Sequence, residues 1–132
     1  MAAIYLAAAL DTVDATRDYA ERLRADGHDI VSTWHDVVRS GDVDPDAVGA
    51  RYSILATNLL DLSLASHVVA DTRHGHPCAT FGEISWAIAH GQRVIWIHPL
   101  GPRADGVRHT NTYDSHPLVT VVHGESEASV ML

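Results

Sequence analysis

The segment 80–83 (TFGE) combines a reactive residue type with the spacing of a helix start. Thr80 stands three residues before Glu83, and apolar residues follow at helical spacing until Gly91. The pattern predicts a helix that begins near Thr80 with Glu83 in its first turn, where the helix dipole favours a charged carboxylate. Two interpretations are open. Glu83 closes a capping box by reaching back to the Thr80 N–H, or it points into a pocket and acts chemically.

The elements that must position Glu83 are strands and helices that alternate along the chain. Short apolar or β-branched runs predict strands over residues 3–8, 28–34, 65–70, 93–98 and 118–123. Helical patterns lie between most of them, so we expect a single α/β domain over residues 1–132, with a five-stranded parallel sheet covered by helices on both faces. Ligands bind beyond the carboxyl ends of the strands in such sheets. The helix that carries Glu83 is expected to open beside those ends.

The segment 48–62 predicts a long amphipathic helix that follows a proline-marked start at Asp44-Pro45. Its apolar residues fall four and three apart, which predicts one stripe facing the core: Val48, Tyr52, Leu55, Leu59 and Leu62. A second, largely polar stripe lies beside it, made of Arg51, Ile54, Asn58 and Asp61. This second stripe is either a solvated face or, for Asn58 and Asp61, part of the site wall.

Composition excludes several classes of function. Nine basic and 17 acidic residues give a formal net charge of −8, which leaves no basic face for phosphates, so we expect no binding to long nucleic acid. The apolar run IYLAAAL at the N-terminus is too short to span a bilayer, so no membrane partner is expected. Cys78 is the only cysteine, which favours a reducing cytoplasm.

Motifs for common cofactors are absent from the sequence. It contains no G-x-G-x-x-G, no G-x-x-x-x-G-K-[ST] and no G-x-S-x-G, so we expect neither a cofactor nor a serine nucleophile. His74, His76 and Cys78 form the one group that could supply metal ligands, but their spacing is not an established zinc pattern. No metal is expected, and a metal-dependent protein remains the least favoured alternative.

Four segments, taken in order, resemble one protein family. They are Ile4-Tyr5-Leu6-Ala7, Gly27-His28-Asp29-Ile30-Val31-Ser32-Thr33-Trp34, Ala65-Ser66-His67-Val68-Val69-Ala70, and Gly82-Glu83-Ile84-Ser85-Trp86-Ala87 with Gly91 and Val94-Ile95. Together they cover nearly the whole chain and resemble the nucleoside 2-deoxyribosyltransferases and the related 2′-deoxynucleoside 5′-monophosphate N-hydrolases.

The resemblance implies a flavodoxin-like, Rossmann-like three-layer domain. It also implies cleavage of the N-glycosidic bond of a 2′-deoxynucleoside or its monophosphate, with the sugar passed to another base or to water. By position, Glu83 is similar to the family's nucleophile and Tyr5 to the tyrosine that orients it. Asn58 falls near a sugar-binding position, and Asn111 is similar to a segment that reaches into a neighbouring subunit, which implies a homo-oligomer.

The sequence also departs from the family. Ala8 and Ala9 stand where relatives commonly have glycine and proline, which weakens a sugar- or phosphate-binding turn, and Ser66 stands where relatives have an aspartate, which removes a candidate acid. These departures favour the alternative of a non-catalytic nucleotide-binding or sensor domain of the same fold.

The remaining roles in such a reaction are open at the level of the sequence. Asp71, Asp61 and Asp11 are all candidates for protonating the leaving base. The N–H groups of Phe81 and Gly82 are candidates for holding a sugar hydroxyl or a 5′-phosphate. Trp34 and Trp86 are candidates for stacking on the base, and the loop 99–117 is the candidate lid.

Overall fold

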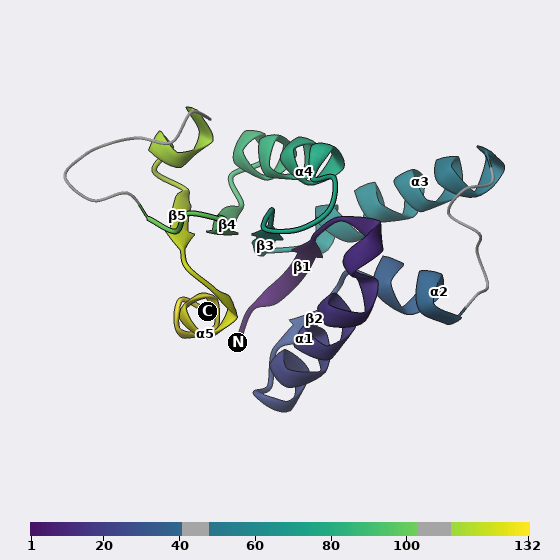
Figure 1. Ribbon diagram of the computed structural model, residues 1–132, viewed down its shortest axis with the longest axis horizontal. Helices are drawn as coiled ribbons and strands as arrows, with labels where there is room; N and C mark the ends of the chain where they lie inside the picture. The colour runs from purple at the N-terminus through teal and green to yellow at the C-terminus, as the bar shows by residue number, and fades with distance from the viewer. Residues whose placement is uncertain (41–47, 103–111) are drawn as a thin grey trace.

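Five parallel strands form the centre of the computed structural model, which describes residues 1–40, 48–102 and 112–132. The strands are β1 (Ala3–Ala7), β2 (Asp29–Ile30), β3 (His67–Asp71), β4 (Arg93–Ile97) and β5 (Val119–Val122). They lie in the order β2-β1-β3-β4-β5 (Figure 1). The predicted α/β fold with a five-stranded parallel sheet is confirmed, and this order is that of a flavodoxin-like fold.

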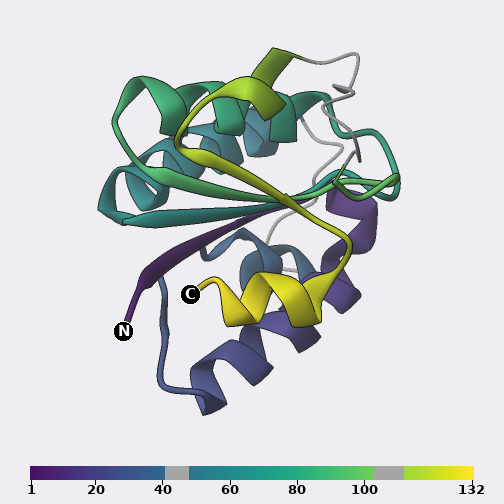
Figure 2. The same ribbon diagram turned by 90° about the vertical axis from the view of Figure 1, so that its left-hand side faces the viewer.

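Helices cover both faces of the sheet. They are η1 (Leu10–Thr12), α1 (Val13–Ala25), α2 (Trp34–Ser40), α3 (Val48–Leu64), α4 (Cys78–Ala89), η2 (Thr112–Ser115) and α5 (Glu125–Val130). Figure 2 shows α3 and α4 above the sheet and α1 and α5 below it. No helix in the described parts of the chain is long and apolar enough to cross a membrane.

The sheet divides the buried side chains into two cores. Successive strand residues point to opposite faces, so Leu6 and Val69 pack toward α1 while Tyr5 and Val68 pack toward α3 and α4. β4 is buried on both faces from Val94 to Ile97, as its continuous apolar run predicts. Packing on both faces holds the sheet in place and so fixes the position of the carboxyl ends of its strands.

The second strand is much shorter than predicted, and α2 begins where its end was expected. Side chains replace the strand ladder at this point: the Leu6 N–H donates to Ser32 Oγ (3.1 Å), and Trp34 Nε1 donates to the Leu6 carbonyl (2.8 Å). The backbone groups of Leu6 are therefore satisfied without a longer β2, and the chain is free to turn into α2 at Trp34.

The core-facing stripe predicted for α3 is correct for Leu62 but wrong for Tyr52, Leu55 and Leu59. Leu62 is fully buried, but Tyr52 is 76% exposed and Leu55 is 56% exposed. The neighbouring stripe faces the protein instead, because Ile54 and Asn58 line a pocket. The helix carries apolar residues on both stripes, so its periodicity alone could not tell which one is buried.

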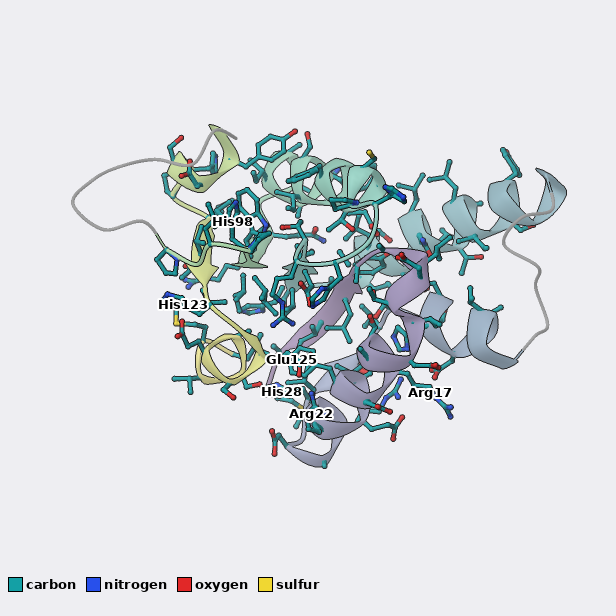
Figure 3. The ribbon with its side chains drawn as sticks, viewed as in Figure 1. Arg17, Arg22, His28, His98, His123 and Glu125 are labelled. Atoms are coloured by element: carbon teal, nitrogen blue, oxygen red, sulfur yellow. The ribbon has the colours of Figure 1, made fainter. Side chains whose placement is uncertain are left out.

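The C-terminal helix α5, which the sequence patterns did not predict, closes the lower face of the sheet. The Tyr19 hydroxyl of α1 lies 3.1 Å from Ser129 Oγ of α5, and Arg22 forms an ion pair with Glu125 (Figure 3). These contacts join the two helices across a gap of about 100 residues in the sequence.

Candidate active site

A pocket of about 560 Å³ opens at the carboxyl end of β1. Four segments form it: the turn after β1 with η1, the start of α2, the middle of α3, and the loop before α4 with the first turns of that helix. Its lining residues are Ala8, Ala9, Leu10, Asp11, Trp34, Ile54, Leu55, Asn58, His76, Ala79 and Glu83. The sequence placed ligand binding at this edge of the sheet, and this pocket lies there.

Glu83 lies in the second turn of α4, because the helix begins at Cys78 and not near Thr80. The predicted helix start was therefore wrong by about half a turn. Thr80 is itself inside the helix, so Glu83 and Thr80 cannot form a capping box. Glu83 instead lines the pocket, and its Oε2 atom is buried with no hydrogen-bond partner in the described part of the chain.

Burial controls the ionisation of Glu83. It raises the pKa of this carboxyl from 4.5 to about 7, and the Tyr5 hydroxyl beside it offsets part of that shift. The pKa of Tyr5 is also raised, first by its own burial and then by the negative charge of Glu83, so its hydroxyl stays protonated. Tyr5 Oη and Glu83 Oε2 make no hydrogen bond of regular geometry, which leaves both atoms able to bond a ligand or each other.

Two expectations drawn from the helix start are corrected by this geometry. The helix dipole does not keep Glu83 charged, since its effect is confined to the first turn and burial outweighs it. The Phe81 N–H donates to the Pro77 carbonyl (3.0 Å), and Gly82 lies inside the helix. Their N–H groups are not free to bind a phosphate or a sugar hydroxyl.

Asn58 and Trp34 both line the pocket, as the predictions for substrate binding require. Asn58 Oδ1 is buried and has no partner among the described residues, so it is an unused acceptor at the pocket wall. Trp34 is almost fully buried, and its bond to the Leu6 carbonyl fixes the indole ring in the pocket wall. A planar ligand would meet a ring that is already fixed.

The three candidate acids lie in different environments. Asp11 lines the pocket. Asp61 accepts bonds from the Thr33 N–H (2.9 Å) and hydroxyl (2.7 Å), and Asp71 accepts two bonds from the Arg73 guanidinium (2.9 and 2.7 Å) beside a separate small cavity. Asp11 is the only one of the three that the structure brings to the pocket beside Glu83.

Several other predicted residues lie away from the pocket. Trp86 stacks on His90 with ring centroids 3.9 Å apart, is half-buried against the core, and does not line the pocket. Ser66 lies just before β3 and bonds to the backbone of Ala3. It is therefore at the amino ends of the strands, whereas the pocket lies at their carboxyl ends. An acid at position 66 would not reach Glu83, so this departure from the family removes nothing from the site.

Two further predictions concern loops. Asn111 and most of the candidate lid, residues 103–111, lie outside the described residues. His74, His76 and Cys78 are described, and no three His, Cys, Asp or Glu side chains in the described ranges come together as a group that could hold a metal ion.

Sequence reasoning missed part of the pocket wall. Ile54, Leu55, His76 and Ala79 line the pocket but were not predicted to do so. The signal for Ile54 and Leu55 was present, since both neighbour Asn58 on one helix face at spacings of four and three. His76 and Ala79 lie at the pocket because α4 begins at Cys78, which the sequence did not reveal.

The fold and the pocket define the class: an α/β protein with a titratable, largely buried carboxyl in a pocket at the carboxyl edge of a parallel sheet. A scan against protein-family models found no match, and a search of curated proteins found none either.

Proposed function

We propose that the protein cleaves the N-glycosidic bond of a 2′-deoxynucleoside or its 5′-monophosphate and passes the sugar to another nucleobase or to water. The observation that carries this proposal is the environment of Glu83. Its carboxyl has a buried oxygen with no partner among the described residues, and it lines a ligand-sized pocket beside a buried tyrosine hydroxyl. The resemblance of the sequence to the nucleoside 2-deoxyribosyltransferases and their N-hydrolase relatives supports the same chemistry.

In this proposal Glu83 is the nucleophile. Its carboxylate oxygen attacks C1′, the C1′–N bond breaks, and the base leaves with the bonding electron pair and takes up a proton. The transition state is oxocarbenium-like, so the carboxylate stabilises its positive charge. Water or a second nucleobase then attacks C1′ of the covalent deoxyribosyl ester and restores the Glu83 carboxylate.

The neighbouring residues fit supporting roles. Tyr5 donates to Glu83 and holds it toward C1′, Asn58 accepts a bond from a sugar hydroxyl, and Trp34 contacts the base. Asp11 is the favoured source of the proton for the leaving base, because it shares the pocket with Glu83 while Asp61 and Asp71 are held by other partners. The pKa of Glu83, about 7, means that the nucleophile becomes ionised at or just above neutral pH.

The proposal includes assembly into a homodimer or higher homo-oligomer. The outer face of α3 exposes Tyr52, Leu55, Leu59, Leu60 and Leu64, and Asp61 is the only charged residue between positions 52 and 64. Two copies with a net charge of −8 each can approach most closely where neither carries charge, and this face provides such a surface. Leu55 belongs both to this face and to the pocket, so a second copy packed there would help to close the pocket mouth. We also propose a cytoplasmic location, in line with a single, exposed cysteine.

Sedimentation tests the assembly. Leu60→Asp should dissociate the oligomer, whereas Leu100→Asp, an exposed leucine outside α3, should not. A wild-type protein that sediments as a monomer at all accessible concentrations would remove this part of the proposal.

Chromatography of the released base tests the activity. A panel of 2′-deoxynucleosides and their 5′-monophosphates is incubated with wild type, Glu83→Ala and the surface control Glu21→Gln, with and without a second base. Loss of the nucleophile should lower turnover by at least about a thousandfold, whereas the control should retain it. Binding of these ligands without release of base from any of them would favour the alternative, a nucleotide-binding or sensor domain.

A further inference from the structure

We infer that Arg73 is a positioning residue for the candidate active site and that it acts from the opposite face of the sheet. It links the loop 73–77, which leads into α4 and forms one wall of the pocket, to the C-terminal helix α5. This inference rests on the proposed function, because it concerns how the wall of the same pocket is held. The ion pairs of Arg73 and the contacts of the loop carry it.

The loop 73–77 lies between two cavities. His76 lines the active-site pocket, together with Ala79 in the first turn of α4. Arg73 and His74 line a separate cavity of about 80 Å³, which lies on the other face, between the sheet, α1 and α5. Neighbouring residues of one short segment therefore face opposite sides, so a shift of Arg73 would move the backbone that carries His76.

Arg73 is held at the end of β3 by Asp71, the last residue of that strand. Asp71 Oδ1 accepts bonds from the Arg73 N–H (3.0 Å) and Nε (2.9 Å), and Asp71 Oδ2 accepts a bond from Nη2 (2.7 Å). Three bonds between two residues fix both the side chain and the backbone of Arg73. The two side chains are only 27% and 23% exposed, so water competes less with these bonds than it would on an open surface.

Glu125 extends this link to α5. One carboxylate oxygen of Glu125 lies 3.8 Å from Arg73 Nη2, and the other pairs with Arg22 of α1 (Figure 3). The Tyr19 hydroxyl of α1 also donates to the Glu125 carbonyl (3.3 Å). Negative and positive side chains therefore alternate from the strand end to α1, and the loop is linked to both helices of the lower face.

The rest of the loop depends on close packing. Residues 74–76 make no hydrogen bond within the described ranges. Gly75 adopts a φ of +67° and packs against Ala9 and the Asp11 carboxylate, an approach that is possible because it has no side chain. Loss of the Arg73 contacts would leave this packing as the main restraint on the loop before α4 begins.

The position of Glu83 does not depend on the loop in the same way. Glu83 lies in the second turn of α4, and this helix is held in the core by Ile84 and Ala87, which are fully buried. Burial and the Tyr5 hydroxyl set the pKa of Glu83, whereas Arg73 lies at the other face of the sheet. Loss of Arg73 should therefore weaken ligand binding at the wall that carries His76, with the carboxylate and its ionisation unchanged.

Initial-rate kinetics on the common 2′-deoxynucleosides and hydrogen exchange followed by mass spectrometry test the inference in parallel. Arg73→Ala should raise KM at least about fivefold and change kcat less than about twofold, and the acid limb of the pH profile should not move. Amide exchange of residues 73–79 should become at least about tenfold faster, while exchange of β1 and β4 should stay unchanged.

Three further variants complete the comparison. Arg73→Lys keeps the charge but lacks the planar fork, so both effects should be smaller than in Arg73→Ala. Glu125→Gln weakens the contact with α5 without altering the loop, and it should give a smaller change of the same kind. Arg93→Ala, which removes an exposed arginine at the amino end of β4, should change neither KM nor the exchange of residues 73–79.

Each result has a separate meaning. Unchanged exchange of residues 73–79 in Arg73→Ala overturns the inference and leaves the proposed glycosidic cleavage standing. A fall in kcat at constant KM, or faster exchange throughout the sheet, also overturns it, because the effect would not be confined to the pocket wall. Faster exchange of the loop alone, in a protein whose wild type releases no base, supports the role of Arg73 and overturns the cleavage. If Arg73→Ala does not fold, the same comparison with Glu125→Gln decides the inference.

Discussion

Replacing Glu83 by glutamine should stabilise the protein at high pH and not at low pH. The pKa of Glu83 is about 7 in the folded protein and 4.5 ordinarily, a difference that corresponds to about 3 kcal/mol. Below about pH 4.5 the carboxyl is protonated in both the folded and the unfolded chain. Between these two pKa values the folded state holds a proton that the unfolded state has released, so the free energy of unfolding falls as pH rises. Above pH 7 the ionised group opposes folding in full.

Urea unfolding at pH 5 and pH 8.5 measures this effect in wild type, Glu83→Gln and the surface control Glu21→Gln. At pH 8.5 the Glu83→Gln variant should gain about 3 kcal/mol, or on the order of 10 °C in melting temperature, and at pH 5 most of that gain should vanish. The control should change little at either pH. An equal effect of Glu83→Gln at both values would refute the claim that an ionisable, buried carboxyl faces this pocket.

Three further outcomes follow from the same contacts. Tyr5→Phe removes the hydroxyl that lowers the pKa of Glu83, so the acid limb of the kcat/KM profile, expected near pH 7, should move to higher pH in initial-rate measurements. Leu62→Ala should cost about 2–5 kcal/mol in urea unfolding, whereas Leu59→Ala on the same expected stripe should cost less than about 1 kcal/mol in the monomer; equal costs would contradict the observed orientation of α3. Ser32→Ala removes the acceptor of a buried backbone N–H and should cost about 1–3 kcal/mol by chemical denaturation, with no change in the pH profile of activity.

The strands were predictable because each one is a local signal. The run RVIWI in β4 is apolar at nearly every position, as a strand covered on both faces must be, and β1 and β3 follow the same rule. Parallel pairing and the position of the ligand edge follow from the alternation of strands and helices. Glu83 and Trp34 were candidates from residue type and position along the chain, whereas the role of Tyr5 and the sugar-binding role of Asn58 were implied by the resemblance to the nucleoside 2-deoxyribosyltransferase family.

The orientation of α3 was not predictable, because hydrophobic periodicity is a property of one helix and burial depends on what packs against it. Leu55 is as apolar as Leu62, but only Leu62 meets the core. The end of β2 likewise depends on distant groups, since Ser32 and Trp34 bond to Leu6 of another strand.

The sequence by itself determined the fold class and the positions of β1, β3, β4 and β5, and it singled out Glu83 as a candidate, because these depend on residue types and short-range spacing. Only the tertiary structure decided that α4 begins at Cys78 and that Asp11, out of three aspartates, reaches the pocket. It also decided that the pKa of Glu83 is raised to about 7, because desolvation is the work of all the surrounding elements together and no local pattern encodes it.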